Sequence, residues 1–164
     1  MFAINTDGTG FTTLYNFTPN PGPSFTNIDG AGPYDGLVLS SNVLYGTTIR
    51  GGSSNNGTVF AIETRGTSFR TLHFFTGGSD GGLSGAGLIL SDGTLYGTTQ
   101  SGGSLGNGTV LAVNTDGTVF TVLHSFTATS GSTNSDGFGG TFEVDAGDGA
   151  DRVIVNASDR KSVV

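Results

Sequence analysis

The stretch Leu44-Tyr45-Gly46-Thr47-Thr48 returns 51 residues later as Leu95-Tyr96-Gly97-Thr98-Thr99. Gly57-Thr58-Val59 returns at the same interval as Gly108-Thr109-Val110. A fixed interval of this size is typical of stacked or ring-shaped repeat proteins, in which each unit is too small to bury its own apolar face. The sequence therefore predicts a chain built from repeated supersecondary units.

The composition favours β-structure. The chain has 164 residues, of which 30 are glycine, 34% are hydrophobic and 12% are charged. Glycine lies well above its average of about 7%, and with many Thr and Ser residues it disfavours helices and fits short strands joined by tight turns. No apolar run approaches the roughly 18 residues of a membrane-spanning helix. We expect an all-β chain without membrane insertion.

Charge and cysteine content exclude several kinds of partner and site. Six basic and thirteen acidic residues give a net charge of −7, which repels phosphate backbones, so we expect no nucleic acid partner. The absence of cysteine excludes disulfides and thiolate metal sites and is compatible with an exported bacterial protein. The first eight residues lack the basic and apolar regions of a signal peptide.

The second repeat can be divided into four strands. Residues 87–91 and 94–99 flank the turn Asp92-Gly93, which is a hairpin signature. A glycine-rich loop then leads to residues 108–114, and a further turn leads to residues 120–126. We expect these segments to form a four-stranded antiparallel meander.

The last strand of the meander occurs three times, at residues 11–17, 69–75 and 120–126. Strict alternation along the middle copy predicts one face with Phe69, Thr71, His73 and Phe75, and an opposite face with Arg70, Leu72 and Phe74. Because both faces carry large side chains, we expect sheets that are covered on both sides.

Antiparallel meanders that repeat about every 51 residues predict a β-propeller-like fragment, with a β-solenoid or a sandwich as the alternative. A propeller typically has about four to eight blades, whereas this chain carries at most two whole repeats. Its open blade edges are expected to favour self-association.

The chain divides into five expected segments. They are the end of a truncated repeat with a proline-rich loop (1–34), two repeats (35–85 and 86–136), a divergent acidic β tail (137–158) and a non-native scar (159–164). Met1 aligns with Val59 and Val110 in the middle of a strand, and the last six residues look like translated sequencing adapter. We therefore expect a fragment of a larger repeat protein.

Several motifs recur in a fixed order over residues 1–126, namely Leu-Tyr-Gly-Thr-Thr, Gly-Gly, Gly-Thr-Val-Phe and Leu-His-x-Phe. This order resembles the GloVer tandem repeat of bacterial surface and exported proteins. The resemblance implies a secreted or cell-surface protein whose biochemical role is not established. We expect a non-catalytic extracellular module with a structural or binding role, and a polysaccharide or a protein as its partner.

The aromatic and histidine positions suggest packing first and ligand binding second. His73 and His124 are equivalent to Tyr15, which predicts an aromatic packing site with a polar tip. Tyr45 and Tyr96 have the same interpretation, but as ligand-binding candidates they could stack on a sugar at a central mouth.

The acidic residues give little support for catalysis. A glycosidase needs two carboxylates flanking the bond that is cleaved, whereas Asp7, Asp92 and Asp116 stand in turns. Glu63 aligns with asparagine in the other units. No catalytic residue is therefore assigned, and the alternative is a carbohydrate-active propeller enzyme of which this chain is a part.

One segment of the tail suggests calcium. Residues 146–154 resemble a single turn of the RTX calcium repeat, and Asp145, Asp148 and Asp151 could supply oxygen ligands. Such sites form by stacking of consecutive turns, and only one turn is present. The alternative is an acidic hairpin in which residues 152–155 form a strand, with no cofactor.

Overall fold

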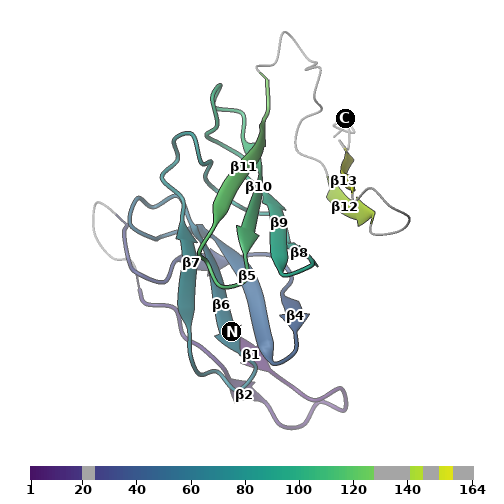
Figure 1. Cartoon of the computed structure of the whole chain (residues 1–164). Coiled ribbons are helices and arrows are strands. Elements are labelled where there is room, and N and C mark those ends of the chain that lie inside the picture. The colour runs from purple at the N-terminus through teal and green to yellow at the C-terminus, as the bar shows by residue number, and fades with distance from the viewer. Residues whose placement is uncertain (20–24, 128–140, 146–151, 157–164) are drawn as a thin grey trace, which may run out of the picture.

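The computed structural model describes residues 1–19, 25–127, 141–145 and 152–156 (Figure 1). These residues form strands, turns and loops without a helix, which confirms the all-β expectation. Among them no helix is long and apolar enough to cross a membrane. The strands are β1 (Phe2–Ala3), β2 (Thr12–Thr13), β3 (Ala31–Pro33), β4 (Val38–Ser40), β5 (Val43–Arg50), β6 (Thr58–Glu63), β7 (Arg70–Phe74), β8 (Ile89–Ser91), β9 (Thr94–Thr98), β10 (Thr109–Asn114), β11 (Phe120–Ser125), β12 (Thr141–Asp145) and β13 (Arg152–Asn156).

The strands form two larger antiparallel sheets and two short pairs. In one sheet, strands β8, β9, β10 and β11 pair in chain order. In the other, β5, β6 and β7 pair in chain order, and both β3 and β4 pair with the other side of β5. Strand β1 pairs with β2, and β12 pairs with β13. Strand β3 lies before the expected repeat start at residue 35, yet it pairs with β5 of that repeat.

The turn between β8 and β9 shows why the repeats fold locally into hairpins. Asp92 and Gly93 connect the strands with φ of 45° and 75°, and Ser91 pairs with Thr94 across the turn. Two consecutive residues with positive φ suit the right-handed twist of a hairpin, and Asp-Gly is a favoured pair for it.

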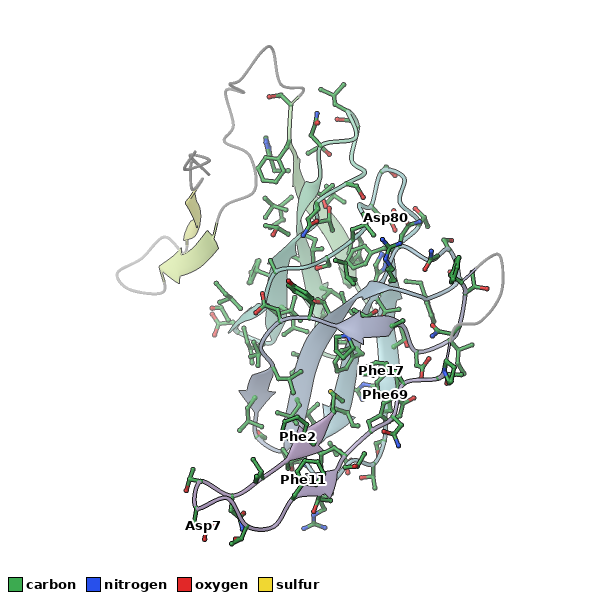
Figure 2. All side chains as sticks on the ribbon, turned by 180° about the vertical axis from the view of Figure 1, so that it is seen from behind. Phe2, Asp7, Phe11, Phe17, Phe69 and Asp80 are labelled. Carbon is green, nitrogen blue, oxygen red and sulfur yellow. The ribbon has the colours of Figure 1, made fainter. Side chains whose placement is uncertain are left out.

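The main core lies between the two larger sheets. The buried side chains that form it are Tyr45, Val59, Ala61, Phe75, Leu88, Leu95, Leu111 and Val113. Phe60, which neighbours Val59 on β6, is fully buried on the opposite side of its sheet, where Phe17 and Phe69 contact it. Figure 2 shows Phe17 and Phe69 close together in this second layer. The sheet of β3–β7 is therefore covered on both sides, as expected.

A β-bulge contradicts the expected face assignment of the last strand. Val59 pairs with His73 but Phe60 pairs with Thr71, so Leu72 is an extra residue in β7. The same shift occurs between Val110 and Leu111 opposite β11. Because an extra residue reverses the alternation, Phe69 and His73 lie on opposite faces of their sheet. The prediction that they share a face is wrong.

Candidate functional site

Equivalent polar and aromatic side chains meet at two places between successive repeats. We call each of these places an inter-repeat joint. The first joint consists of Tyr15, Thr18, Asp29 and Phe69, and the second consists of His73, Thr76, Asp80 and Phe120.

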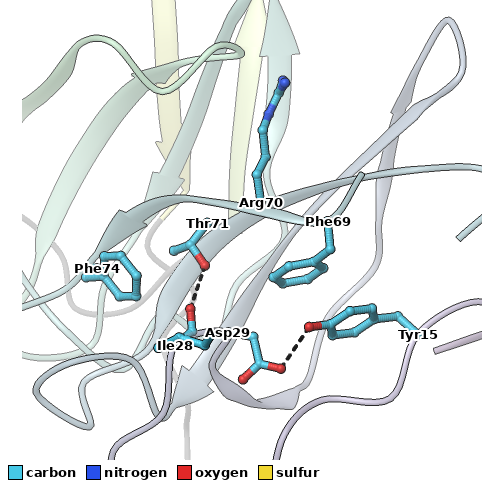
Figure 3. Close-up of a pocket in the computed structure, with 7 residues that line it drawn as sticks. All are labelled: Tyr15, Ile28, Asp29, Phe69, Arg70, Thr71 and Phe74. Carbon is cyan, nitrogen blue, oxygen red and sulfur yellow. Dashed lines mark hydrogen bonds between the residues drawn. The ribbon is translucent and has the colours of Figure 1, made fainter. Parts of the chain in front are cut away.

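In the first joint, Tyr15 stacks on Phe69 with 4.1 Å between ring centroids and 9° between ring planes. The Tyr15 hydroxyl donates a hydrogen bond of 2.9 Å to Asp29 Oδ2 (Figure 3). Thr18 donates to the same oxygen from its backbone N–H and from its hydroxyl, at 2.7 Å and 2.9 Å. Asp29 is only 2% exposed, and its Oδ1 has no hydrogen-bond partner among the described residues.

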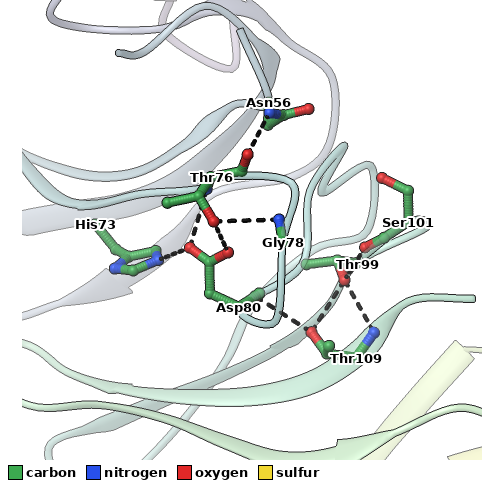
Figure 4. A network of polar contacts seen from close by, with 8 residues as sticks. All are labelled: Asn56, His73, Thr76, Gly78, Asp80, Thr99, Ser101 and Thr109. Atoms are coloured by element: carbon green, nitrogen blue, oxygen red, sulfur yellow. Dashed lines mark hydrogen bonds and ion pairs between the residues drawn. The ribbon is translucent and has the colours of Figure 1, made fainter. Parts of the chain in front are cut away.

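In the second joint, His73 stacks on Phe120 with 3.7 Å between ring centroids and 6° between ring planes. His73 Nε2 lies 3.1 Å from Asp80 Oδ2, which also accepts a 2.9 Å hydrogen bond from the Thr76 N–H (Figure 4). The Thr76 hydroxyl donates to Asp80 Oδ1. The prediction that His73 is a packing aromatic with a polar tip is confirmed.

Burial and hydrogen bonding set the charge states of the joints. Burial lowers the pKa of His73 below 6.5, although Asp80 acts in the opposite direction. Burial by itself would raise the pKa of Asp80, but hydrogen bonds from Thr76 and His73 outweigh it and hold that pKa below 3.8. Burial, together with the bond to Asp29 and its charge, raises the pKa of Tyr15 to about 12. At neutral pH the second joint therefore contains a neutral imidazole beside a carboxylate.

A buried pair of threonines anchors each joint to the sheet behind it. The hydroxyls of Thr99 and Thr109 lie 3.0 Å apart, and the Thr109 N–H donates to Thr99 Oγ1 at 2.9 Å. Thr109 Oγ1 also donates to the Asp80 carbonyl at 3.5 Å. Thr48, Thr58 and Asp29 repeat this arrangement in the first joint. The backbone carbonyl of each joint aspartate is thus bonded to one threonine, on β6 or β10, which is itself bonded to the other threonine of the pair.

The glycine that follows each joint aspartate is required by this packing. Gly30 and Gly81 have φ of 92° and 93°, a region that side chains other than glycine rarely adopt. A Cβ at Gly30 would overlap Thr48 Oγ1, and one at Gly81 would overlap Thr99 Oγ1. The Asp-Gly dipeptide is therefore part of the joint as well as of a turn.

The other sequence candidates lie outside the joints. Tyr45 is 5% exposed in the core between the sheets, and its equivalent Tyr96 is half-buried. His124 is exposed and contacts Phe126 edge to face, with 5.5 Å between centroids. The ligand-binding role of the two tyrosines stays a prediction.

The turn acids have the local partners that their sequence context suggests. Asp7 accepts hydrogen bonds from the N–H and hydroxyl of Thr9, and Asp116 accepts the same pair from Thr118. Glu63 accepts a hydrogen bond from Thr67. Turn geometry accounts for these carboxylates.

The described part of the chain does not include all three calcium candidates, so it does not show how they lie relative to one another. Asp148 and Asp151 lie outside it, and only the backbone of Asp145 is described, at the end of β12. The described residues contain no group of three or more His, Cys, Asp or Glu side chains that could hold a metal ion. Calcium binding stays a prediction from the sequence.

A shallow hollow of about 380 Å³ borders the first joint (Figure 3). Arg70 also lines it, but its guanidinium points away from the hollow and donates a 3.0 Å hydrogen bond to the Thr115 carbonyl. Thr71 Oγ1 donates a hydrogen bond of 3.0 Å to the Ile28 carbonyl. The hollow combines aromatic and apolar walls with a few polar groups. Its lining residues are Tyr15, Ile28, Asp29, Phe69, Arg70, Thr71 and Phe74.

The joint aspartates are not apparent from the sequence as site residues. Asp29 and Asp80 look like other Asp-Gly turns, because this dipeptide is a common turn signal. A signal for them exists, since Asp29-Gly30 and Asp80-Gly81 are separated by the same 51 residues as the tyrosine motif.

The sheets and joints define an all-β repeat protein in which an aromatic side chain of one repeat packs on the next. A family model described as the Gloeobacter/Verrucomicrobia repeat matches residues 1–149. The chain therefore belongs to this repeat family, as its motif order predicted. No curated protein and no solved structure matches the chain.

Proposed function

We propose that this chain is a non-catalytic, extracellular repeat module that serves a structural or binding role within a propeller-like protein. The observation that carries the proposal is the position of His73 and Asp80, the histidine and carboxylate that would otherwise be candidates for catalysis. His73 and Asp80 face each other in the second joint, where they connect two repeats. In a hydrolase the histidine of such a pair would also bond a nucleophile, whereas here its ring packs on Phe120.

The propeller-like arrangement is supported by two features. Each large sheet is antiparallel with sequential strands, and the two sheets follow one another in the chain and pack face to face. Propeller blades have this strand order and this mode of packing. A solenoid or a sandwich is the alternative, and a structure of a longer member of the same repeat array would distinguish them.

Secretion or surface display is proposed on the family membership alone. This location is tested by fractionating cells that express the natural full-length gene and detecting the repeat in each fraction. We expect the repeat outside the cytoplasmic membrane, and recovery in the cytosol alone would contradict this part of the proposal.

The structural role and the alternative role in a carbohydrate-active enzyme predict different effects of the same variant. Asp80→Asn keeps the shape of the side chain but removes its charge. We expect a lower melting temperature and no polysaccharide hydrolysis by either the variant or the unaltered chain. Hydrolysis by the unaltered chain that Asp80→Asn abolishes without loss of stability would favour the enzyme.

A binding role would use the hollow beside the first joint. Its volume lies within the roughly 300–1,000 Å³ of small-molecule sites, and aromatic walls with a few polar groups suit a sugar unit of a polysaccharide. Phe74 lies in β7 at the edge of the sheet and is partly exposed. We expect that Phe74→Ala weakens binding of any glycan identified on an array, whereas Leu105→Ala, at an exposed loop position, leaves it unchanged.

A further inference from the structure

One oxygen of a residue that lines the hollow at the first joint has no hydrogen-bond donor. Asp29 is 2% exposed and is among the residues that line the hollow (Figure 3). Its Oδ2 accepts three hydrogen bonds, one from the Tyr15 hydroxyl and two from Thr18. Its Oδ1 accepts none among the described residues. A buried carboxylate oxygen without a donor is costly, so a ligand that supplies the donor would stabilise the folded chain.

The equivalent aspartate in the second joint has a donor for each oxygen. Asp80 Oδ2 accepts a hydrogen bond from the Thr76 N–H and lies 3.1 Å from His73 Nε2, and the Thr76 hydroxyl donates to Asp80 Oδ1. In the first joint the Thr18 hydroxyl donates to Oδ2 instead. The unpartnered Oδ1 is therefore particular to the first joint and is not a general property of the repeat.

The walls of the hollow also depart from the repeat. Ile28 and Phe74 line the hollow, whereas the residues 51 positions later are Ser79 and Ser125. Phe74 is 37% exposed, so part of its ring is accessible. Because serine serves at the equivalent position of the next sheet, the fold of the repeat does not require an aromatic ring there. An unpartnered oxygen and an unrepeated aromatic wall thus occur at the same place.

No positive charge of the lining residues faces the hollow. Arg70 is the only Lys, Arg or His among them, and its guanidinium points away and donates to the Thr115 carbonyl at 3.0 Å (Figure 3). The hollow therefore presents a carboxylate and aromatic rings. The net charge of −7 of the whole chain also attracts cations and repels anions.

These features favour a ligand that carries a positive charge and N–H donors next to a compact apolar surface. A protonated amine donates charge-assisted hydrogen bonds to a carboxylate, and the attraction is stronger in partly buried surroundings than in water. Aromatic rings also attract an ammonium group through their faces. An acidic ligand such as a uronic acid would be repelled.

We propose that the hollow binds an amino sugar unit of a polysaccharide, with the protonated amine directed towards Asp29 Oδ1 and the sugar ring against Phe74. This inference rests on the binding role proposed above and specifies its ligand. A volume of about 380 Å³ suits a sugar ring. A lysine side chain carries the same charge on a narrow, flexible stem, so it would leave most of the hollow unfilled.

Asp29→Asn tests the role of the unpartnered oxygen while keeping the joint. The amide oxygen can accept the hydrogen bonds from Tyr15 and Thr18 in place of Oδ2, and the amide nitrogen then takes the position of Oδ1 and presents a donor. Asp92→Asn is the matched control, because it removes the same charge at an exposed turn where Asn-Gly serves as well as Asp-Gly. Both variants are checked for folding by circular dichroism before binding is measured.

Titration calorimetry in mildly acidic buffer, in which the amines are protonated, compares three probes. They are a glucosamine tetramer, the same tetramer with every amine acetylated, and a lysine tetramer. We expect the unaltered chain and Asp92→Asn to bind the glucosamine tetramer about tenfold or more tightly than either other probe. Asp29→Asn should lose this preference. The comparison of the two sugar tetramers uses the unaltered chain, so it holds even if Asp29→Asn does not fold.

Each other result separates this inference from the role on which it rests. Equal affinity for the two sugar tetramers would overturn the amino sugar assignment and leave a glycan-binding role in place. A preference that Asp29→Asn retains would place the amine elsewhere and overturn the assignment as well, as would binding of the lysine tetramer as tightly as the glucosamine tetramer. Absence of binding to these probes and to every glycan of an array would contradict the binding role itself.

Discussion

His73 lies flat against Phe120 of the following repeat, with 3.7 Å between the ring centroids. The same imidazole has Nε2 3.1 Å from Asp80 Oδ2. One side chain therefore packs across the boundary between repeats and bonds to the loop that enters the next sheet. The joints fix neighbouring sheets relative to one another through this double contact.

Replacement of His73 by alanine should lower the free energy of unfolding by about 1–3 kcal/mol, since it removes both the aromatic stacking and the bond to Asp80. His73→Tyr should retain most of the stability because Tyr15 performs the same role in the first joint. Chemical denaturation measures both values. Leu105→Ala, at an exposed loop position, is the control, and an equal loss there would show that the effect is not specific to the joint.

Acid should destabilise the fold in two steps. The pKa of His73 is lowered below 6.5, so the unfolded chain binds more protons just below that pH, and stability falls as pH decreases through the folded pKa. The pKa of Asp80 is lowered below 3.8, so its contribution is present above that pH and is lost at more acidic pH. Melting temperatures of the unaltered chain and of His73→Phe, measured against pH, should differ in the first step. Identical profiles would contradict this assignment.

Alkali should act through Tyr15. Because its pKa is raised from 10.0 to about 12, the folded state keeps the phenolic proton longer than the unfolded chain does. The stability that this provides is fully present below pH 10 and is lost as pH rises towards 12. Tyr15→Phe should flatten this part of the profile in thermal melts. An unchanged slope would mean that another group titrates there.

The glycine after the joint aspartate should tolerate no side chain. Gly81→Ala combines a positive φ with overlap of the new Cβ and Thr99 Oγ1, so we expect a loss well above the roughly 1 kcal/mol of conformational strain. Gly106→Ala is the control because Gly106 has a similar φ of 81° and open space around its Cβ position. Unfolding free energies of the two variants separate packing from backbone strain. Equal losses would mean that the overlap is relieved by small shifts.

The repeat interval and the turn residues were sufficient to predict the β-structure and the division into strands, because short apolar runs between Gly and Asp turns have few alternatives. They also predicted the aromatic packing of His73. The faces of β7 could not be predicted, since the extra residue Leu72 is visible only in the pairing of β7 with β6.

The joints themselves were only half predictable. Tyr15 and His73 were recognised as equivalent positions, but Asp29 and Asp80 reach them from loops of different length. The first loop, between Thr18 and Asp29, is longer than the second, between Thr76 and Asp80. Loop length does not determine where a carboxylate lies, so contacts of this kind depend on the tertiary structure.

A double-mutant cycle between His73 and Phe120 tests most directly whether these residues join two repeats. Unfolding free energies are measured for the unaltered chain, His73→Ala, Phe120→Ala and the double variant. Rings stacked in this way predict a coupling energy of about 0.5–1.5 kcal/mol. Strictly additive losses would contradict the account, because they would mean that the contact between the two rings does not stabilise the fold.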